Sequence, residues 1–118
     1  MSVDYSRIME IWKNAPNRGE MEDADVVAEG ENPVCGDRVR IFLKIRNGRV
    51  ADASFTGEGC AISIASASLL ADYAKGRTME EMKGLGKEKM MELLGLDLSK
   101  NPSRLKCALL PLMAIKKK

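Results

Sequence analysis

The feature that most constrains the fold is an alternating stretch at residues 38–46. Apolar side chains at positions 39, 41, 43 and 45 alternate there with Arg or Lys at positions 38, 40, 44 and 46. A period of two places successive side chains on opposite faces of a strand, so the pattern predicts a β-strand with one buried face. Strands of this kind belong to antiparallel sheets that are covered on one side. Phe42 falls on the solvated face, where we expect another segment to cover it.

An Asn47-Gly48 pair follows and predicts a β-hairpin, whose register is set by the hydrophobic pattern. A two-residue turn pairs Leu43 with Asp52, which mixes apolar and polar side chains on one face. A three-residue loop at 46–48 keeps the apolar face intact, so we predict this loop, with Gly48 in the left-handed position of a bulge. The expected pairs are Leu43 with Ala51, Ile41 with Ala53, and Val39 with Phe55.

Charge is distributed unevenly before and within this hairpin. Residues 20–31 contain six acids and no base, whereas residues 38–49 contain five bases and no acid. A weaker strand pattern at 24–29 carries part of the acidic run. Neighbouring strands of opposite sign stabilise each other across a sheet, so the pattern favours self-complementary strands over a charged patch for a partner.

The rest of the chain reads mainly as helix. Residues 5–13 predict a short helix with Tyr5, Ile8, Met9 and Trp12 on one face. After a tight loop at 56–59, a helix rich in small residues is expected at 60–75, and Thr78 with Glu81 forms a capping box that starts another. Methionines and leucines between 79 and 94 favour core packing over a docking face. The last helix is expected at 103–115 despite Pro111. The length of 118 residues predicts one domain, 1–118.

Composition excludes several classes of function. A net charge of +2 and an aromatic content of 4% argue against a nucleic-acid partner. No apolar run is long enough to span a bilayer and no secretory segment opens the chain, so we expect no membrane partner, and reduced cysteines in the cytoplasm. The absence of histidine excludes histidine-dependent catalysis and leaves Cys and carboxylate as metal ligands.

Three cysteines carry the most chemical information. Cys35, Cys60 and Cys107 all fall near the ends of predicted elements rather than in the middle of apolar stretches. A single free cysteine is most often a small buried apolar residue, but three at such positions favour a shared site. Asp37 is two residues from Cys35 and can point to the same place. Three thiolates and one carboxylate make four ligands, enough for tetrahedral zinc or one end of an iron–sulfur cluster.

Local charge is expected to activate two of the thiols. Cys60 lies at a helix N-terminus, where unpaired N–H groups lower the pKa of a thiol. Cys107 follows Arg104 and Lys106, two cations that favour thiolate over thiol. Lys106 is either a solvated side chain or an electrostatic support for thiolate or persulfide charge, and the residues do not decide between the two.

Four segments together form a recognisable set of motifs: Asn14-Ala15-Pro16-Asn17-Arg18-Gly19, Cys35-Gly36-Asp37, Gly59-Cys60-Ala61 with the serine-rich run after it, and Lys106-Cys107. With these motifs the chain resembles, over nearly its whole length, the IscU/SufU/NifU-N scaffold proteins of iron–sulfur cluster assembly. The resemblance implies an α+β fold, with a three-stranded antiparallel sheet covered by helices, and a surface site of Cys35, Asp37, Cys60 and Cys107.

The chain departs from both branches of that family. IscU-type members carry His where this chain has Lys106, and their chaperone-binding LPPVK segment is replaced by Asn101-Pro102-Ser103-Arg104-Leu105. The stretch 104–108 and the motif Gly57-Glu58-Gly59-Cys60 look like SufU. The 47 residues from Cys60 to Cys107 leave no room for the insertion of the SufU branch.

The resemblance implies a non-enzymatic scaffold rather than an enzyme. A cysteine desulfurase is expected to present a persulfide, which Cys107 accepts in preference to the other candidates, Cys35 and Cys60. Iron then joins the thiolates, with a [2Fe–2S] cluster expected before a [4Fe–4S] cluster and with recipient apo-proteins as its destination. Asp37 is a harder and weaker ligand than a fourth Cys, which suits a carrier that must release its cluster. Exposed ligands also permit two chains to share one cluster.

Two alternatives use the same four residues. A zinc-dependent, SufU-like sulfurtransferase holds Zn²⁺ and releases one Cys to accept persulfide sulfur. A structural zinc module holds zinc without sulfur traffic, but such sites are usually built on CxxC pairs, and this sequence has none.

Overall fold

The computed structural model describes residues 5–34 and 36–118, and within them one antiparallel sheet packs against helices. Its three strands are ordered β1-β2-β3 and connect in sequence order. They span Val26–Asn32 (β1), Asp37–Arg46 (β2) and Arg49–Glu58 (β3). The expected α+β class and three-stranded sheet are therefore confirmed.

The hairpin between β2 and β3 differs from the predicted one. Asn47 and Gly48 form a two-residue turn with φ of 55° and 77°, so Arg46 pairs with Arg49. The ladder then shifts between Lys44 and Ile45, because Ala51 is an extra residue on β3. This β-bulge restores an all-apolar face, and the pairing of Leu43 with Ala53, Ile41 with Phe55 and Val39 with Gly57 replaces the predicted one.

Both flanking strands are longer or later than predicted. β3 continues to Glu58, so residues 56–58 are strand and the tight loop expected at 56–59 is wrong. β1 begins at Val26 and runs to Asn32, instead of spanning 24–29. Both extensions lengthen the sheet toward Asp37, the first residue of β2.

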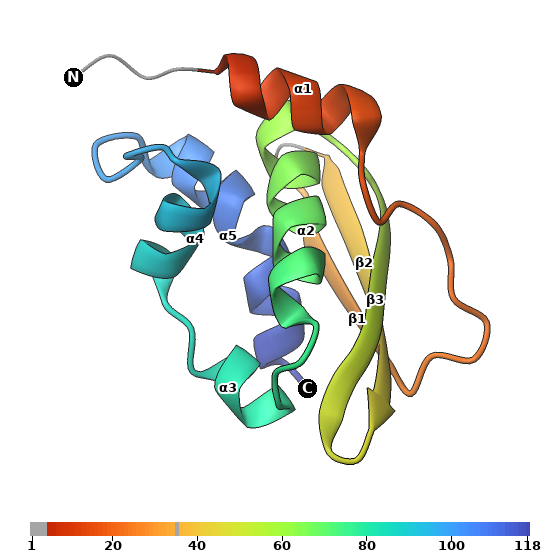
Figure 1. Cartoon of the computed structure of the whole chain (residues 1–118). Coiled ribbons are helices and arrows are strands. Elements are labelled where there is room, and N and C mark those ends of the chain that lie inside the picture. Colours follow the sequence, from red (N-terminus) through yellow and green to blue (C-terminus); the bar gives the residue numbers. More distant parts are fainter. Residues whose placement is uncertain (1–4, 35) are drawn as a thin grey trace.

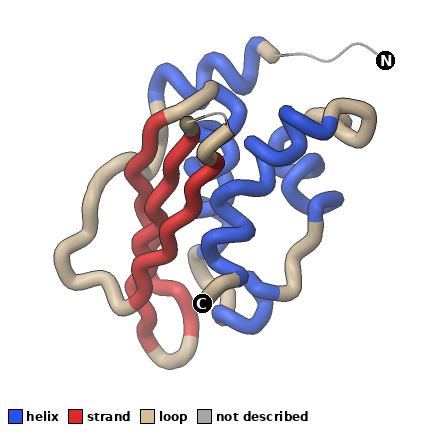
Figure 2. The backbone as a smooth tube through the Cα atoms, turned by 180° about the vertical axis from the view of Figure 1, so that it is seen from behind, coloured by secondary structure: helices blue, strands red, loops and turns tan. Residues whose placement is uncertain are grey.

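Five helices surround one face and one end of the sheet in the described part of the chain. α2 (Ala61–Ala74) and α5 (Pro102–Lys116) pack on the sheet, while α1 (Ser6–Asn14) crosses the beginning of α2 (Figures 1 and 2). α3 (Met79–Lys83) and α4 (Lys87–Leu94) lie on the far side of α2 and α5 from the strands. Thr78 caps α3 in the predicted capping box, and α5 continues through Pro111 as expected.

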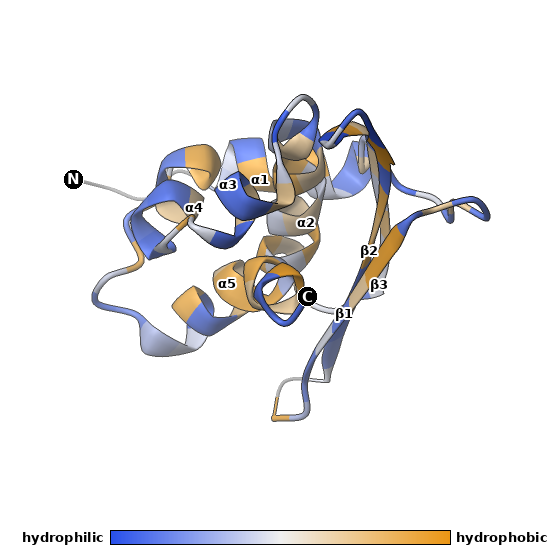
Figure 3. Cartoon of the chain, turned by 90° about the horizontal axis from the view of Figure 1, so that it is seen from below, coloured by the Kyte–Doolittle hydropathy of each residue, from blue (hydrophilic) through white to orange (hydrophobic). Residues whose placement is uncertain are grey.

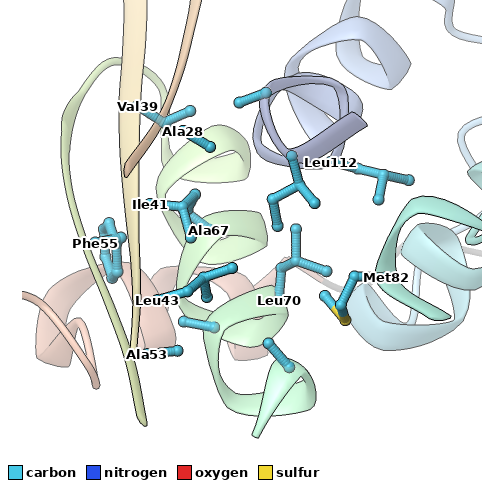
Figure 4. Packing of buried hydrophobic residues seen from close by; sticks show 14 of the residues in the cluster. Ala28, Val39, Ile41, Leu43, Ala53, Phe55, Ala67, Leu70, Met82 and Leu112 are labelled. Carbon is cyan, nitrogen blue, oxygen red and sulfur yellow. The ribbon is translucent and has the colours of Figure 1, made fainter. Parts of the chain in front are cut away.

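The main core lies between the sheet and these helices. Ile41 and Leu43 of β2 face Ala67 and Leu70 of α2, with Leu112 of α5 beyond them (Figure 4). Small residues along α2 are buried, as predicted for a helix that lies close to a sheet. Met82 and Met90 are also fully buried, which confirms the core interpretation of the methionines. Figure 3 shows apolar residues both along the strands and on the helices that pack against them, including α5.

Charged pairs cover the outer face of the sheet. Arg40 lies 2.8 Å from Glu29, Arg38 lies 3.6 Å from Glu31, and Lys44 lies 2.9 Å from Asp23. Exposed ion pairs of this kind each contribute roughly 0–1 kcal/mol to the stability of the fold. Their main effect is therefore to favour the pairing of strands with opposite charge. The self-complementary strands predicted from the charge pattern are confirmed.

Phe42 on this outer face is covered by the chain before β1. Gly19 N donates to Phe55 O of β3 (2.8 Å), and Asp25 N donates to Leu43 O beside β1 (2.9 Å). Residues 20–24 therefore cross from one edge of the sheet to the other, on the face where Lys44 binds Asp23. This crossing segment accounts for the burial of Phe42.

α1 buries a different face from the predicted one. Ile8 is fully buried, but Met9 and Trp12 are 48% and 42% exposed. Tyr5 packs in the cluster of Ile8 as predicted, and Ile11 takes the place expected for Met9 and Trp12. The described contacts of α1 are with the beginning of α2 and neighbouring residues of α4 and α5. Within the described residues no helix has the length and apolar character to cross a bilayer.

Candidate metal centre

Three of the four predicted ligands converge at one end of the sheet. The ligand atoms of Asp37, Cys60 and Cys107 all lie within 4.8 Å of one another. They come from the first residue of β2, the residue before α2, and the first half of α5. The fourth candidate, Cys35, lies outside the described residues.

Asp37 is held in place by the chain that leads into α2. The residue is 1% exposed, and its Oδ1 accepts a hydrogen bond from Cys60 N (3.0 Å). Its Oδ2 lies 3.7 Å from Cys60 Sγ, which donates to it. Gly59 makes this approach feasible, because a Cβ at that position would collide with Asp37 Oδ1 and its φ is +147°.

Cys60 is the residue that precedes α2, as its motif predicted. Its side chain is exposed and its backbone is extended, with φ −72° and ψ 161°. Its sulfur also lies 3.6 Å from Ser63 Oγ, one helical turn further on. Ser63 was not among the residues predicted for the site; its position three residues after Cys60, on the same side of the helix, was the available signal.

Cys107 is buried, with 6% of its surface exposed, and packs with Ile8, Ile62 and Leu98. Burial raises the pKa of the Cys107 thiol, and hydrogen bonding and charge from Asp37 and Cys60 raise it further. The expectation that nearby cations favour its thiolate is therefore wrong for the metal-free chain. Arg104 instead lies over the Tyr5 ring, 5.1 Å from its centre.

Comparison with known families decides how this arrangement is classified. The family model described as the NifU-like N terminal domain matches residues 4–118. The chain belongs to this family.

Curated relatives of this NifU-like domain carry two kinds of name. The zinc-dependent sulfurtransferase SufU of Bacillus subtilis is 37% identical over 125 residues, which covers 93% of this chain and 84% of the relative. The iron–sulfur cluster assembly scaffold protein IscU of Thermotoga maritima is 37% identical over 128 residues, which covers 95% of this chain and 89% of the relative. Both branches suggested by the motifs are thus represented.

Solved structures agree with the fold. An iron–sulfur cluster assembly scaffold protein for the SUF system from Fervidobacterium islandicum superposes with a TM-score of 0.82 at 29% identity, covering 95% of this chain and 93% of that one. The N-terminal part of a NifU-like protein from Brucella abortus gives a TM-score of 0.79 at 25% identity, over 95% and 88% of the two chains.

The donor set of this NifU-like domain fits a thiophilic metal. The two sulfurs and the carboxylate oxygen that the described residues bring together suit Zn²⁺ or iron. A metal bound to such thiols keeps them deprotonated, which overrides the raised pKa of Cys107 in the metal-free state.

A groove leads to both described sulfurs of the NifU-like domain. It has a volume of about 470 Å³ and lies between α1 and α5, with Cys60 and Cys107 in its wall. Tyr5, Ile8 and Met9 line it on the side of α1. The groove gives a sulfur or metal donor a largely apolar approach to the centre.

Replacement of Gly59 by Ala is expected to destabilise the metal-free domain by about 1–3 kcal/mol. The cost arises because an L-residue is strained at φ +147° and its Cβ would displace the Asp37 carboxylate. Urea unfolding measures the change. Gly84→Ala is the matched control, since Gly84 has an ordinary φ of −82° and a Cβ there meets no atom closer than 3.5 Å. Equal stability of the two variants would contradict the expected role of Gly59.

The raised pKa of Cys107 predicts that the metal-free domain loses stability in alkaline solution. Above the ordinary thiol pKa of 9.0, the unfolded chain releases this proton while the folded chain keeps it. The unfolded state then binds fewer protons, so the free energy of unfolding falls by at most about 1.4 kcal/mol per pH unit. Urea unfolding of wild type and Cys107→Ala between about pH 8 and pH 10 tests this. The free energy of unfolding should fall less with pH in Cys107→Ala than in wild type. Parallel pH curves for the two proteins would contradict the prediction.

Proposed function

We propose that this chain is a scaffold on which an iron–sulfur cluster is assembled and from which it is transferred to apo-proteins. The observation that carries the proposal is the convergence of Asp37, Cys60 and Cys107, whose ligand atoms lie within 4.8 Å of one another. Cys35 supplies the fourth ligand in this proposal. The naming of IscU relatives as assembly scaffolds supports it.

Sulfur arrives as a persulfide on a cysteine desulfurase. A scaffold thiolate attacks the outer persulfide sulfur, a new S–S bond forms, and the desulfurase cysteine leaves as a thiolate, so no net oxidation occurs. Cys35, Cys60 and Cys107 remain the candidate acceptors. The exposed sulfur of Cys60 is easier to reach than the buried Cys107, which favours Cys60 over the Cys107 preferred from sequence. Lys106 is exposed on α5 and supports the persulfide charge in this proposal.

Iron completes the cargo. Each persulfide sulfur gains two electrons to become a bridging sulfide; for two sulfurs, the oxidation of two Fe²⁺ to Fe³⁺ supplies two of the four electrons, and an external dithiol or electron-transfer reductant supplies the other two. Thiolates hold the iron as a first [2Fe–2S] product, and the carboxylate of Asp37 is the weak ligand whose release starts transfer. Because Cys60 is exposed and the groove opens beside it, a second copy of the chain can share the cluster.

Anaerobic reconstitution tests the scaffold. The purified chain is mixed with ferrous iron, cysteine and a cysteine desulfurase, and the visible spectrum and the iron and sulfide contents are recorded. We expect sulfide-to-iron charge-transfer bands from a cluster on the chain. When an apo-ferredoxin is added, this cluster should pass to it and the bands of the ferredoxin should appear. A chain that acquires neither iron nor sulfide would contradict the proposal.

A zinc-dependent sulfurtransferase is the second candidate. It is favoured by the relative named SufU, which is 37% identical over 93% of this chain. Here Zn²⁺ orders the same residues, and one released cysteine accepts sulfur and passes it on. Stoichiometric zinc that excess iron cannot displace, with persulfide formed on the zinc-loaded chain, would favour this candidate over the scaffold.

A further inference from the structure

Ser63 is a buried hydroxyl beside a proposed metal ligand. The residue is fully buried in α2, one turn after Cys60. Its Oγ donates to the Cys60 carbonyl oxygen (3.0 Å) and lies 3.6 Å from Cys60 Sγ. Among the described residues, both groups that this hydroxyl contacts belong to Cys60.

The hydroxyl can turn to the sulfur without leaving the carbonyl unpaired. The Cys60 carbonyl oxygen also accepts from Ile64 N (3.2 Å), as expected in the first turn of a helix. A buried acceptor that loses its sole donor is costly, but this one keeps a donor. Rotation about one side-chain bond of Ser63 is thus sufficient to redirect its proton.

Two other buried serines of α2 behave differently. Ser66 Oγ donates to Ala108 O on α5, and Ser68 Oγ donates to Pro16 O in the loop after α1. Each ties α2 to another element through an acceptor with no link to a sulfur. Among the described serines of α2, Ser63 is the one whose hydroxyl contacts two atoms of a candidate ligand, the carbonyl oxygen and the sulfur of Cys60.

We propose that Ser63 is a positioning residue that donates its hydroxyl proton to Cys60 Sγ when this sulfur binds a metal or an iron–sulfur cluster. The inference rests on the proposed function, because it requires Cys60 to be a ligand. A metal-bound sulfur carries no proton and retains lone pairs, so it accepts where the free thiol donates to Asp37. A hydrogen bond to a ligand sulfur orients it and lowers its electron donation to the metal.

Cobalt binding tests the proposal, because Co²⁺ reports its thiolate ligands through sulfur-to-metal charge-transfer absorption. Ser63→Ala is expected to weaken Co²⁺ binding by about 10- to 100-fold and to move this band to lower energy. Ser68→Ala is the matched control, since it removes a buried hydroxyl from the same helix away from the sulfurs; it should leave both quantities unchanged. Ser63→Thr keeps the hydroxyl and should restore the band.

The outcomes separate this proposal from the one it rests on. Wild type without a thiolate-to-cobalt band would overturn both. A wild-type band that stays unshifted in Ser63→Ala at equal affinity would overturn the role of Ser63 alone. If Ser63→Ala does not fold, as judged by circular dichroism, wild type loaded with ¹¹³Cd²⁺ decides: a scalar coupling between the metal and the Ser63 hydroxyl proton supports the hydrogen bond, and its absence overturns it.

Discussion

Cys107→Ala is expected to abolish cluster assembly while the fold persists. The Cys107 sulfur is one of two that the structure brings within 4.8 Å of the Asp37 carboxylate, so the substitution removes a ligand of the proposed metal centre. Loss of a residue that only supports a ligand weakens metal binding by about 10- to 100-fold, so loss of the ligand itself should cost at least about 100-fold. Anaerobic reconstitution, followed by charge-transfer absorption and iron and sulfide content, measures the effect.

Two controls accompany this variant. Cys107 is a small side chain among apolar neighbours, so alanine is expected to keep the helix and the packing around Ile8 and Ile62. Circular dichroism of the metal-free variant should therefore match wild type. Met113→Ala, at a half-exposed position on the same helix, should assemble a cluster normally. A folded Cys107→Ala that assembles a wild-type cluster would remove Cys107 from the centre.

The hairpin shows why sequence patterns predict strands better than their register. Alternation over residues 38–46 correctly predicted which face of β2 is buried. The predicted register is wrong because it assumed a regular ladder, in which a two-residue turn breaks the apolar face; one extra residue, Ala51, allows both. A bulge is chosen by the packing of the whole sheet, and neither the turn nor the strand pattern encodes its place.

Three of the four predicted ligands, Asp37, Cys60 and Cys107, lie together in the structure, whereas the electrostatics around them differ from the prediction. Cys60 could be placed at the start of a helix because the glycines before it and the change in periodicity mark that boundary. The meeting of Cys60 with Cys107, 47 residues further on, was suggested by the position of both near element ends and strengthened by the family resemblance, since no local rule links residues so distant. The raised pKa of Cys107 was missed because the cations are local in sequence, whereas the burial that outweighs them arises from tertiary packing.

The exposed face of α1 was also missed because tertiary packing, which local sequence does not encode, decides how much of a helix is covered. Helical periodicity identified Ile8 correctly as buried, but it cannot say how wide a face the rest of the protein covers. In the described structure α1 packs across the beginning of α2 and nearby residues, so Trp12 and Met9, which lines the groove, remain exposed.

Asp37→Cys is expected to hold an assembled cluster longer and to transfer it more slowly. The carboxylate is the harder ligand in a soft donor set, and its oxygen is the ligand that a recipient thiolate displaces most readily. With a thiolate at this buried position, release has to begin by breaking an iron–thiolate bond. A transfer half-time to apo-ferredoxin longer by on the order of tenfold corresponds to about 1.4 kcal/mol of added barrier.

Companion variants at the same position separate the ligand from its structural hydrogen bond. Asp37→Asn removes the anionic ligand but retains an oxygen that can accept from Cys60 N, which Asp37 Oδ1 does at 3.0 Å, so its metal-free stability should stay closer to wild type than that of Asp37→Ala. Asp37→Ala removes the labile oxygen and should, like Asp37→Cys, give a persistent cluster that transfers poorly. Because Asp37→Ala also leaves the Cys60 N–H without this acceptor, its metal-free stability is measured alongside by urea unfolding. If Asp37→Cys and Asp37→Ala fold but release their clusters as fast as wild type, the carboxylate does not control transfer.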